Sequence, residues 1–296
     1  MTVDLPLAHF DRYLAGERQA SEHTRRAYGE DLARLSELAR GRDLDTLTPT
    51  DIRGFVRRMA TKGLSPSSIG RILSAWRAFY KIMKRDLGWG ASPVTGIRPP
   101  KRVPRLPAAL TVDSAEGLLN ALPDDEPLAC RDKAIFELAY SSGLRVSELA
   151  SLHLLELDLA HALARVTGKG GKTRVVPVGG AAVEALRRWL LLRPQYARDT
   201  SATVFVGRGG RPLTTRAIHA RLADWRKRLG IAEPLYPHKL RHSCASHLLQ
   251  SSHDLRAVQE LLGHAHLATT QVYTHLDYQA LAKAYDEFHP RARRKE

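Results

Sequence analysis

The stretch that decides the fold is Pro237–Leu276, which reads PHKLRHSCASHLLQSSHDLRAVQELLGHAHLATTQVYTHL. Two of its polar residues, His238 and Arg241, are three positions apart, so they project from one face of a helix. The apolar residues of that helix have a spacing that directs them toward a core: Leu240, Cys244, Ala245, Leu248 and Leu249. The pattern therefore predicts a polar pair that a packed helix holds in place.

A histidine and a tyrosine follow at His264 and Tyr273. Apolar spacing predicts a short amphipathic helix over 254–262, and Gly263 is suited to end it, which places His264 on the turn beyond. Tyr273 follows on a third short segment. Arginine binds phosphate oxygens with a fork of two hydrogen bonds, histidine moves protons near neutral pH, and a tyrosine hydroxyl can become a covalent nucleophile. The set suits chemistry at a phosphodiester.

These spacings resemble the signature of the tyrosine recombinases, the phage-integrase-like family. That signature contains His-x-x-Arg, matched here by His238 and Arg241, and a nucleophilic Tyr nine residues after a His or Trp, matched by Tyr273 after His264. The downstream sequence THLDYQALAKAYDEFHPRARRK resembles the XerC branch. The resemblance covers nearly the whole chain. It implies an enzyme that cuts and rejoins DNA through a 3′-phosphotyrosyl link, with no cofactor, metal or ATP.

Two further motifs match the family. Arg145, in SSGLRVSEL, corresponds to the first motif, which implies that it holds a non-bridging phosphate oxygen together with Arg241. Glu148 lies three residues on and is expected to orient Arg145. Lys169, in the glycine-rich turn VTGKGGKTR, aligns with the general acid that protonates the departing 5′-oxygen. Lys172 is the rival for that role, and the family match alone favours Lys169.

The remaining roles concern proton transfer. An unperturbed tyrosine has a pKa near 10, so Tyr273 must lose or share its proton during attack. His238 is expected to accept that proton, and His264 to donate a hydrogen bond to the phosphate. A metal site is not predicted, because HKLRH is not H-E-x-x-H and the pair His264-x-His266 has no nearby partners.

Composition supports a nucleic-acid partner. The chain has 296 residues, a formal charge of +15 and a pI near 10.1, which favours a polyanion such as double-stranded DNA over a membrane surface. Two cysteines, Cys130 and Cys244, make no disulfide framework. The start MTVDLPLAHF has no signal-peptide pattern, and no apolar run approaches the roughly 20 residues of a membrane span. A cytoplasmic protein is expected.

The length predicts two domains, and the overall pattern is mainly α with a small antiparallel β-sheet. Residues 1–90 are predicted to form a four-helix, core-DNA-binding domain with a basic face. The segment 91–109 has five prolines and four Lys or Arg and is predicted to be an extended basic linker. Residues 110–296 are predicted to form a mixed α/β catalytic domain. Its expected elements are helices over 111–122, 128–141, 146–152, 181–192 and 214–229, a hairpin of strands 163–167 and 173–178, and a short strand over 203–206.

The C-terminal tail has an amphipathic spacing: Tyr278, Leu281, Tyr285 and Phe288. Its residues alone predict packing on the chain's own domain, whereas the resemblance implies a subunit-exchange helix that docks into a neighbour. The resemblance also implies a XerD-like partner in a cyclic heterotetramer, resolution of chromosome and plasmid dimers, and control by a DNA translocase. Alternatives are a mobile-element integrase, a relaxing topoisomerase with the same chemistry, or a non-catalytic basic DNA-binding protein. The XerC-like tail and the lack of an added arm-binding domain favour a XerC-type recombinase over a mobile-element integrase.

Overall fold

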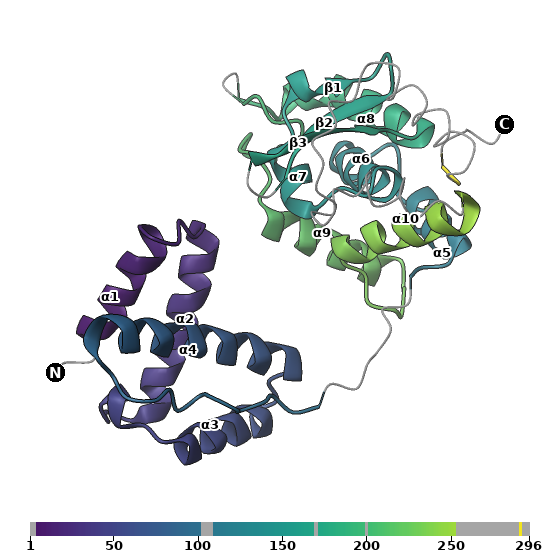
Figure 1. Cartoon of the computed structure of the whole chain (residues 1–296). Coiled ribbons are helices and arrows are strands. Elements are labelled where there is room, and N and C mark those ends of the chain that lie inside the picture. Colours follow the sequence, from purple (N-terminus) through teal and green to yellow (C-terminus); the bar gives the residue numbers. More distant parts are fainter. Residues whose placement is uncertain (1–3, 102–108, 169–170, 199–200, 253–289, 292–296) are drawn as a thin grey trace. The chain divides into compact units, whose positions relative to one another are not determined.

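The computed structural model describes residues 4–101, 109–168, 171–198, 201–252 and 290–291 (Figure 1). The chain divides into two compact units, Met1–Leu106 and Pro107–Glu296, and each has its own hydrophobic core. The described part is mainly helical with one three-stranded antiparallel sheet, so the predicted fold class is confirmed. Among these residues, no helix is both long and apolar enough to cross a membrane.

The first unit contains the four helices that the sequence predicted. Three of them begin where a Ser or Thr side chain accepts a hydrogen bond from the backbone three residues on, at Ser21, Thr48 and Ser65. The longest helix carries Trp76 and Phe79, both fully buried, into the centre of the core. The elements are α1 (Asp4–Ala15), α2 (Glu22–Ala39), η1 (Leu44–Thr46), α3 (Pro49–Thr61) and α4 (Pro66–Leu87).

The start of the predicted linker differs from the structure. Val94 and Ile97 are buried in the core of the first unit, at 0% and 5% exposure, and Arg77 donates a hydrogen bond of 2.5 Å to the carbonyl of Ile97. The prolines of this stretch predicted an extended segment, but its two apolar side chains attach the residues up to 97 to the first unit. Residues 102–108 lie outside the described part.

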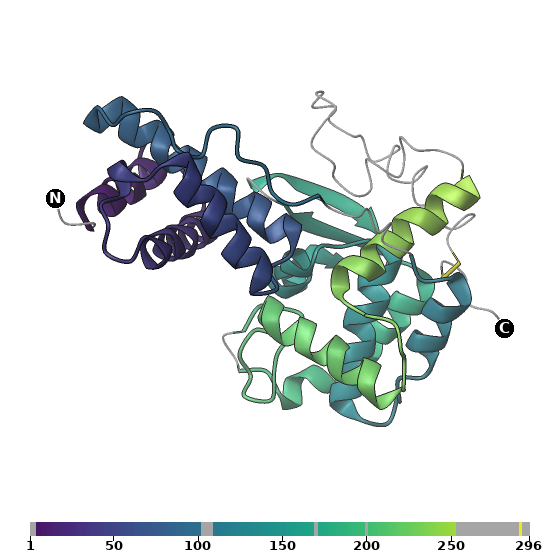
Figure 2. The same cartoon turned by 90° about the horizontal axis from the view of Figure 1, so that it is seen from below.

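The second unit is built around a helix that is buried on almost every side, α6 (Pro127–Ser141). This helix packs against α8 and α10, and α10 also contacts α5 and α9 (Figure 1 and Figure 2). The other elements are α5 (Val112–Asn120), α7 (Val146–Ser151), η2 (Leu154–Glu156), β1 (Leu157–Asp158), β2 (Leu163–Thr167), β3 (Thr173–Pro177), α8 (Gly180–Leu192), η4 (Arg193–Gln195), α9 (Thr215–Arg228) and α10 (Pro237–Ser252).

The predicted hairpin is present, but the predicted strand over 203–206 is not. Strands β2 and β3 pair antiparallel from Leu163 opposite Pro177 to Thr167 opposite Thr173, and β1 pairs with the outer edge of β2. Residues 203–206 make only isolated bridges. Their backbone is held by single backbone hydrogen bonds, such as the one from the Val204 N–H to the Leu152 carbonyl at 2.8 Å, and by the Trp189 indole, which donates to the Val204 carbonyl at 2.9 Å. An apolar run can be buried in this way without a strand partner.

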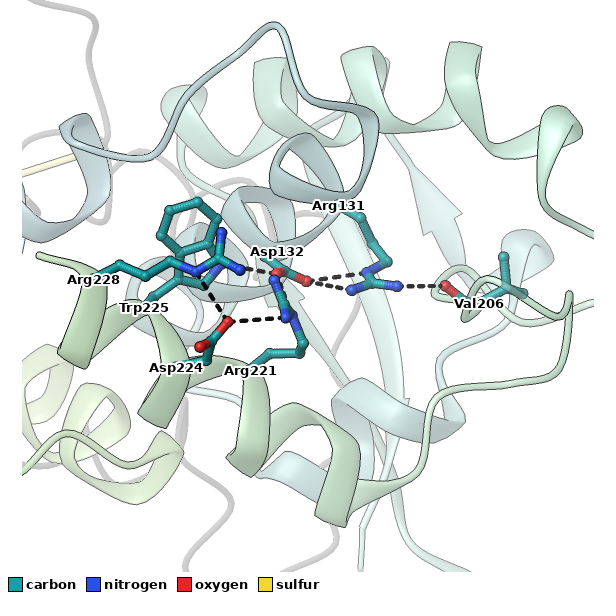
Figure 3. Close-up of polar contacts among 7 residues, drawn as sticks. All are labelled: Arg131, Asp132, Val206, Arg221, Asp224, Trp225 and Arg228. Carbon is teal, nitrogen blue, oxygen red and sulfur yellow. Dashed lines mark hydrogen bonds and ion pairs between the residues drawn. The ribbon is translucent and has the colours of Figure 1, made fainter.

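A buried ion-pair network joins α6 to α9 (Figure 3). Asp132, fully buried on α6, accepts hydrogen bonds from Arg131 at 2.6 Å, from Arg221 at 2.7 Å and from the Trp225 indole at 2.8 Å. Arg131 also donates to the carbonyl of Val206 at 3.1 Å. A buried carboxylate is tolerated when its charge and its lone pairs are satisfied in this way. The network fixes the position of α9 on the central helix.

Candidate active site

The centre of the site is a buried carboxylate that holds two arginines. Glu148 on α7 is 2% exposed. It accepts hydrogen bonds from the Arg145 backbone N–H at 2.8 Å and from the Arg145 guanidinium at 2.9 Å. Arg174 on β3 donates to both carboxylate oxygens, at 2.7 and 3.0 Å. The contact expected between Arg145 and Glu148 is therefore present, and a third side chain takes part in it.

Arg174 was not singled out in the sequence, although a signal for it existed. Side chains alternate along a strand, so Arg174 lies on the same face as Val176, which is fully buried. Its partner in the register, Val166, is 1% exposed. A charged residue on the core face of a strand requires a buried partner, and here that partner is Glu148.

Arg241 approaches the same place from α10. Its side chain is buried and donates a hydrogen bond to the carbonyl of Gly143, two residues before Arg145. Burial, followed by the positive charge of Arg145, lowers the pKa of Arg241 to about 10, so it stays protonated at neutral pH. The structure thus brings together the two arginines that the sequence motifs predicted.

His238 lies at the start of α10, with part of its side chain exposed to solvent and part covered by the protein. Partial burial lowers its pKa below the usual value, and the charges of Arg241, His242 and Arg145 lower it further. A neutral imidazole at physiological pH is the form that can accept a proton. The same charges show that His238 is within electrostatic range of both arginines.

The glycine-rich turn of the hairpin reaches the arginine centre. A Cβ added at Gly168 would lie 3.5 Å from a Glu148 carboxylate oxygen and 3.7 Å from the Arg145 guanidinium. The Gly168 N–H donates to the carbonyl of Lys172 at 2.7 Å, which closes the turn. Lys169 is the next residue and lies outside the described part, so the choice between Lys169 and Lys172 stays a prediction.

His264 and Tyr273 also lie outside the described residues, and their roles stay predictions. What the structure describes is a site with three guanidinium groups, one ionised carboxylate and a histidine. Burial opposes ionisation of Glu148, but hydrogen bonds from Arg174 and Arg145 outweigh it and lower the pKa of Glu148. The three guanidinium groups and the one carboxylate give the site a net charge of +2, which is complementary to a phosphate group. Among the described residues, no group of three or more His, Cys, Asp or Glu is placed to hold a metal ion.

Comparisons with known proteins agree with this geometry. A model described as the phage integrase family matches residues 108–280, and one described as the phage integrase N-terminal SAM-like domain matches residues 7–86. The chain belongs to the phage integrase family. Tyrosine recombinase XerC of Azotobacter vinelandii is 49% identical over 286 residues, covering 96% of this chain and 95% of that protein. Tyrosine recombinase XerC of Pseudomonas aeruginosa is 50% identical over 289 residues, covering 97% and 95%.

A solved structure shares the fold. It is the XerH site-specific recombinase bound to a palindromic difH substrate in a post-cleavage complex, with a TM-score of 0.70 and 22% identity, covering 95% of this chain and 84% of that chain. The family and enzyme class predicted from the sequence are confirmed: the chain is a tyrosine-type site-specific recombinase.

In this recombinase, Ser243 and His247 on the other side of α10 attach the helix that carries Arg241 to the rest of the second unit. Ser243 accepts a hydrogen bond from the backbone N–H of Leu110 at 2.8 Å. The His247 ring lies 2.8 Å from the Leu110 carbonyl and 2.7 Å from the Tyr140 hydroxyl. Both ring nitrogens are thereby used, and burial lowers the pKa of His247, which favours the neutral ring.

The apolar face of α10 was predicted correctly at Leu240 and Cys244, which are fully buried, and at Leu248, which is 5% exposed. Leu249 is 36% exposed, so the prediction that it faces the core is wrong. The apolar spacing shows which side of the helix faces the core, but it does not show how far around the helix the buried surface extends.

Proposed function

We propose that this recombinase cuts and rejoins double-stranded DNA at a short specific site, and that Tyr273 holds the 3′-phosphate during the exchange. The observation that carries the proposal is the convergence of Arg145 and Arg241 on one site, with Arg174 and a single carboxylate. Such a site has an excess of positive charge and presents guanidinium groups, which match the non-bridging oxygens of a phosphodiester.

In the proposed reaction, the Tyr273 oxygen forms a bond to phosphorus while the bond from phosphorus to the 5′-oxygen breaks. The phenol proton passes to His238, and Lys169 gives a proton to the departing 5′-oxygen. Arg145 and Arg241 offset the charge that grows on the phosphorane, and His264 adds a hydrogen bond to it. A 5′-hydroxyl of the new strand then reverses these steps, so an ester replaces an ester and no ATP is needed.

Glu148 and Arg174 act on this reaction through Arg145. The carboxylate is held by both guanidiniums, so the Arg145 side chain has one orientation before DNA arrives. Preorganised donors stabilise a transition state without the cost of being ordered during the reaction. Both residues are therefore positioning residues in the proposal.

A DNA partner is supported by the formal charge of +15 and by the fold shared with a recombinase whose structure contains its DNA substrate. The first unit, which includes the residues up to 97, would bind the core of the site through its basic helices, and the second unit would carry out catalysis. The full-length similarity to XerC proteins supports a XerD-like partner in a cyclic heterotetramer. That assembly would resolve chromosome and plasmid dimers in the cytoplasm, under the control of a DNA translocase.

The test is trapping of the covalent intermediate. A duplex that the protein selects from a random pool is nicked beside the cleavage point, so that the cleaved fragment diffuses away and the adduct accumulates on a denaturing gel. Tyr273→Phe should abolish the adduct and leave DNA binding within about threefold, because only the attacking oxygen is removed. Tyr278→Phe is the matched control and should retain the adduct. An adduct in the Tyr273→Phe variant would overturn the assignment.

The general acid has its own test. A 5′-bridging phosphorothioate substrate has a sulfur leaving group that does not need a proton. It should restore cleavage to Lys169→Ala. Rescue of Lys172→Ala instead would exchange the two assignments.

A further inference from the structure

The first unit places a buried carboxylate beneath a surface arginine. Asp31 on α2 is 2% exposed, and its carboxylate accepts a hydrogen bond from Nη1 of Arg71 on α4. The two helices pack against each other (Figure 1). In the other ion pairs described in this unit, the carboxylate side chains are 19–69% exposed. Among these pairs, Asp31 is therefore the acceptor whose charge is removed from water.

Two contacts from α4 fix the position of Asp31. The buried Trp76 indole donates to the backbone carbonyl of Asp31 at 2.8 Å. The Arg71 guanidinium, from five residues earlier on the same helix, reaches the carboxylate. Burial raises the pKa of Asp31, and the guanidinium opposes that shift. Arg71 is thereby held at a defined place on the surface of α4.

Stability alone does not account for this pair. A buried ion pair gains little over apolar side chains of similar size, because removing the charges from water costs about as much as their attraction returns. The Arg71 side chain is also 52% exposed, so much of it faces solvent. Its Nε and Nη2 have no hydrogen-bond partner among the described residues. The result is an oriented guanidinium that presents donors to solvent.

The charge of the pair indicates what those donors bind. A DNA phosphate is met best by an arginine without a carboxylate, because a nearby negative charge repels the phosphate. The edge of a guanine has no net charge and presents two acceptors, O6 and N7, which an oriented guanidinium binds with two hydrogen bonds. Ser67 and Ser74, about one turn to either side of Arg71, are short and exposed, so they leave α4 free to enter a major groove.

We propose that Arg71 reads a guanine in the major groove of the recombination site and that Asp31 is its positioning residue. This inference rests on the proposed function, since it takes a specific DNA site as the partner. Arg34, exposed and three residues after Asp31, makes no ion pair among the described residues and is suited to a phosphate instead. The first unit thereby separates base reading from phosphate binding.

Selection from a random pool of duplexes tests the base contact in the full-length protein. The sites that wild-type protein selects should contain a G·C pair whose change to A·T weakens its binding at least about fivefold. Arg71→Ala should bind these two sequences within about twofold and keep its preference at the other positions. Arg71→Lys keeps a cation beside Asp31 but lacks the fork, so it should show the same loss with the buried carboxylate still compensated.

The salt dependence of binding separates the two kinds of arginine. Arg34→Ala is the matched control. It should weaken binding to all sequences alike and reduce the slope of log affinity against log salt by about 0.9, with the selected sequence unchanged. Asp31→Asn leaves the Arg71 charge uncompensated, so it should make the slope steeper by about 0.9 and relax the preference for guanine.

The proposal is overturned if Arg71→Ala and Arg71→Lys keep every base preference of the wild type. A lower melting temperature at unchanged base preference would make the pair purely structural, and a changed salt slope at unchanged base preference would make Arg71 a phosphate contact. Failure of the proposed function looks different: wild-type protein would select a site and form no covalent adduct on it, while the selected sequences would still decide the role of Arg71.

Discussion

Replacing Glu148 by glutamine tests how the arginine centre is held. The carboxylate accepts one backbone and three guanidinium hydrogen bonds, all between 2.7 and 3.0 Å. Glu148→Gln keeps the shape but removes the charge and leaves one acceptor oxygen in place of two. Breaking a buried ion pair costs about 3–5 kcal/mol. The Arg145 side chain is 36% exposed and can be partly rehydrated, so we expect about 3 kcal/mol.

The assay is unfolding of the full chain by heat or urea at several pH values. For a unit of this size, about 3 kcal/mol corresponds to a melting temperature lower by roughly 6–12 °C at pH 7. The pKa of Glu148 is lowered in the folded protein, so the unfolded chain takes up the proton first as the pH falls. The stability that ionised Glu148 gives the wild type is therefore lost below about pH 4.5. The difference in the free energy of unfolding between the wild type and Glu148→Gln should decrease there.

Glu126→Gln is the matched control, because Glu126 is exposed and makes no cap hydrogen bond at the start of α6. It should change the free energy of unfolding by less than about 0.5 kcal/mol. The reasoning is refuted if Glu148→Gln is equally harmless at pH 7, or if its effect stays constant down to pH 3.

Three further predictions concern single residues. Arg174→Lys keeps the charge but not the fork, so adduct formation should slow by about tenfold in single-turnover assays while DNA affinity stays within about threefold. Burial lowers the pKa of His247, so wild-type protein should lose stability as the pH falls below about 6.5, and urea unfolding of His247→Gln should lack this step. Gly210→Ala should destabilise by about 1–3 kcal/mol in thermal unfolding, because φ is +70° and a Cβ would lie 2.7 Å from the Tyr196 carbonyl. Gly209→Ala, with no atom within 4 Å of its Cβ, should leave the melting temperature nearly unchanged.

Much of the fold was predictable because its signals are local. A helix start depends on residues three apart, as in the capping box of Thr48 and Asp51. A hairpin depends on alternation and a short turn, as over 163–177. The predictions from the sequence were wrong where an apolar segment packs against residues that are far away along the chain. Val94 and Ile97 pack on helices of the first unit, and residues 203–206 are buried without a ladder.

The sequence by itself determined the helices, the hairpin and, through the spacing of His238, Arg241 and Tyr273, the family. Only the tertiary structure decided that Glu148 is shared between Arg145 and Arg174, and that Arg71 reaches the buried Asp31. Capping and periodicity act over a few residues along the chain. A buried ion pair depends instead on where packing places two distant elements, and the residue types alone do not specify which arginine reaches which carboxylate.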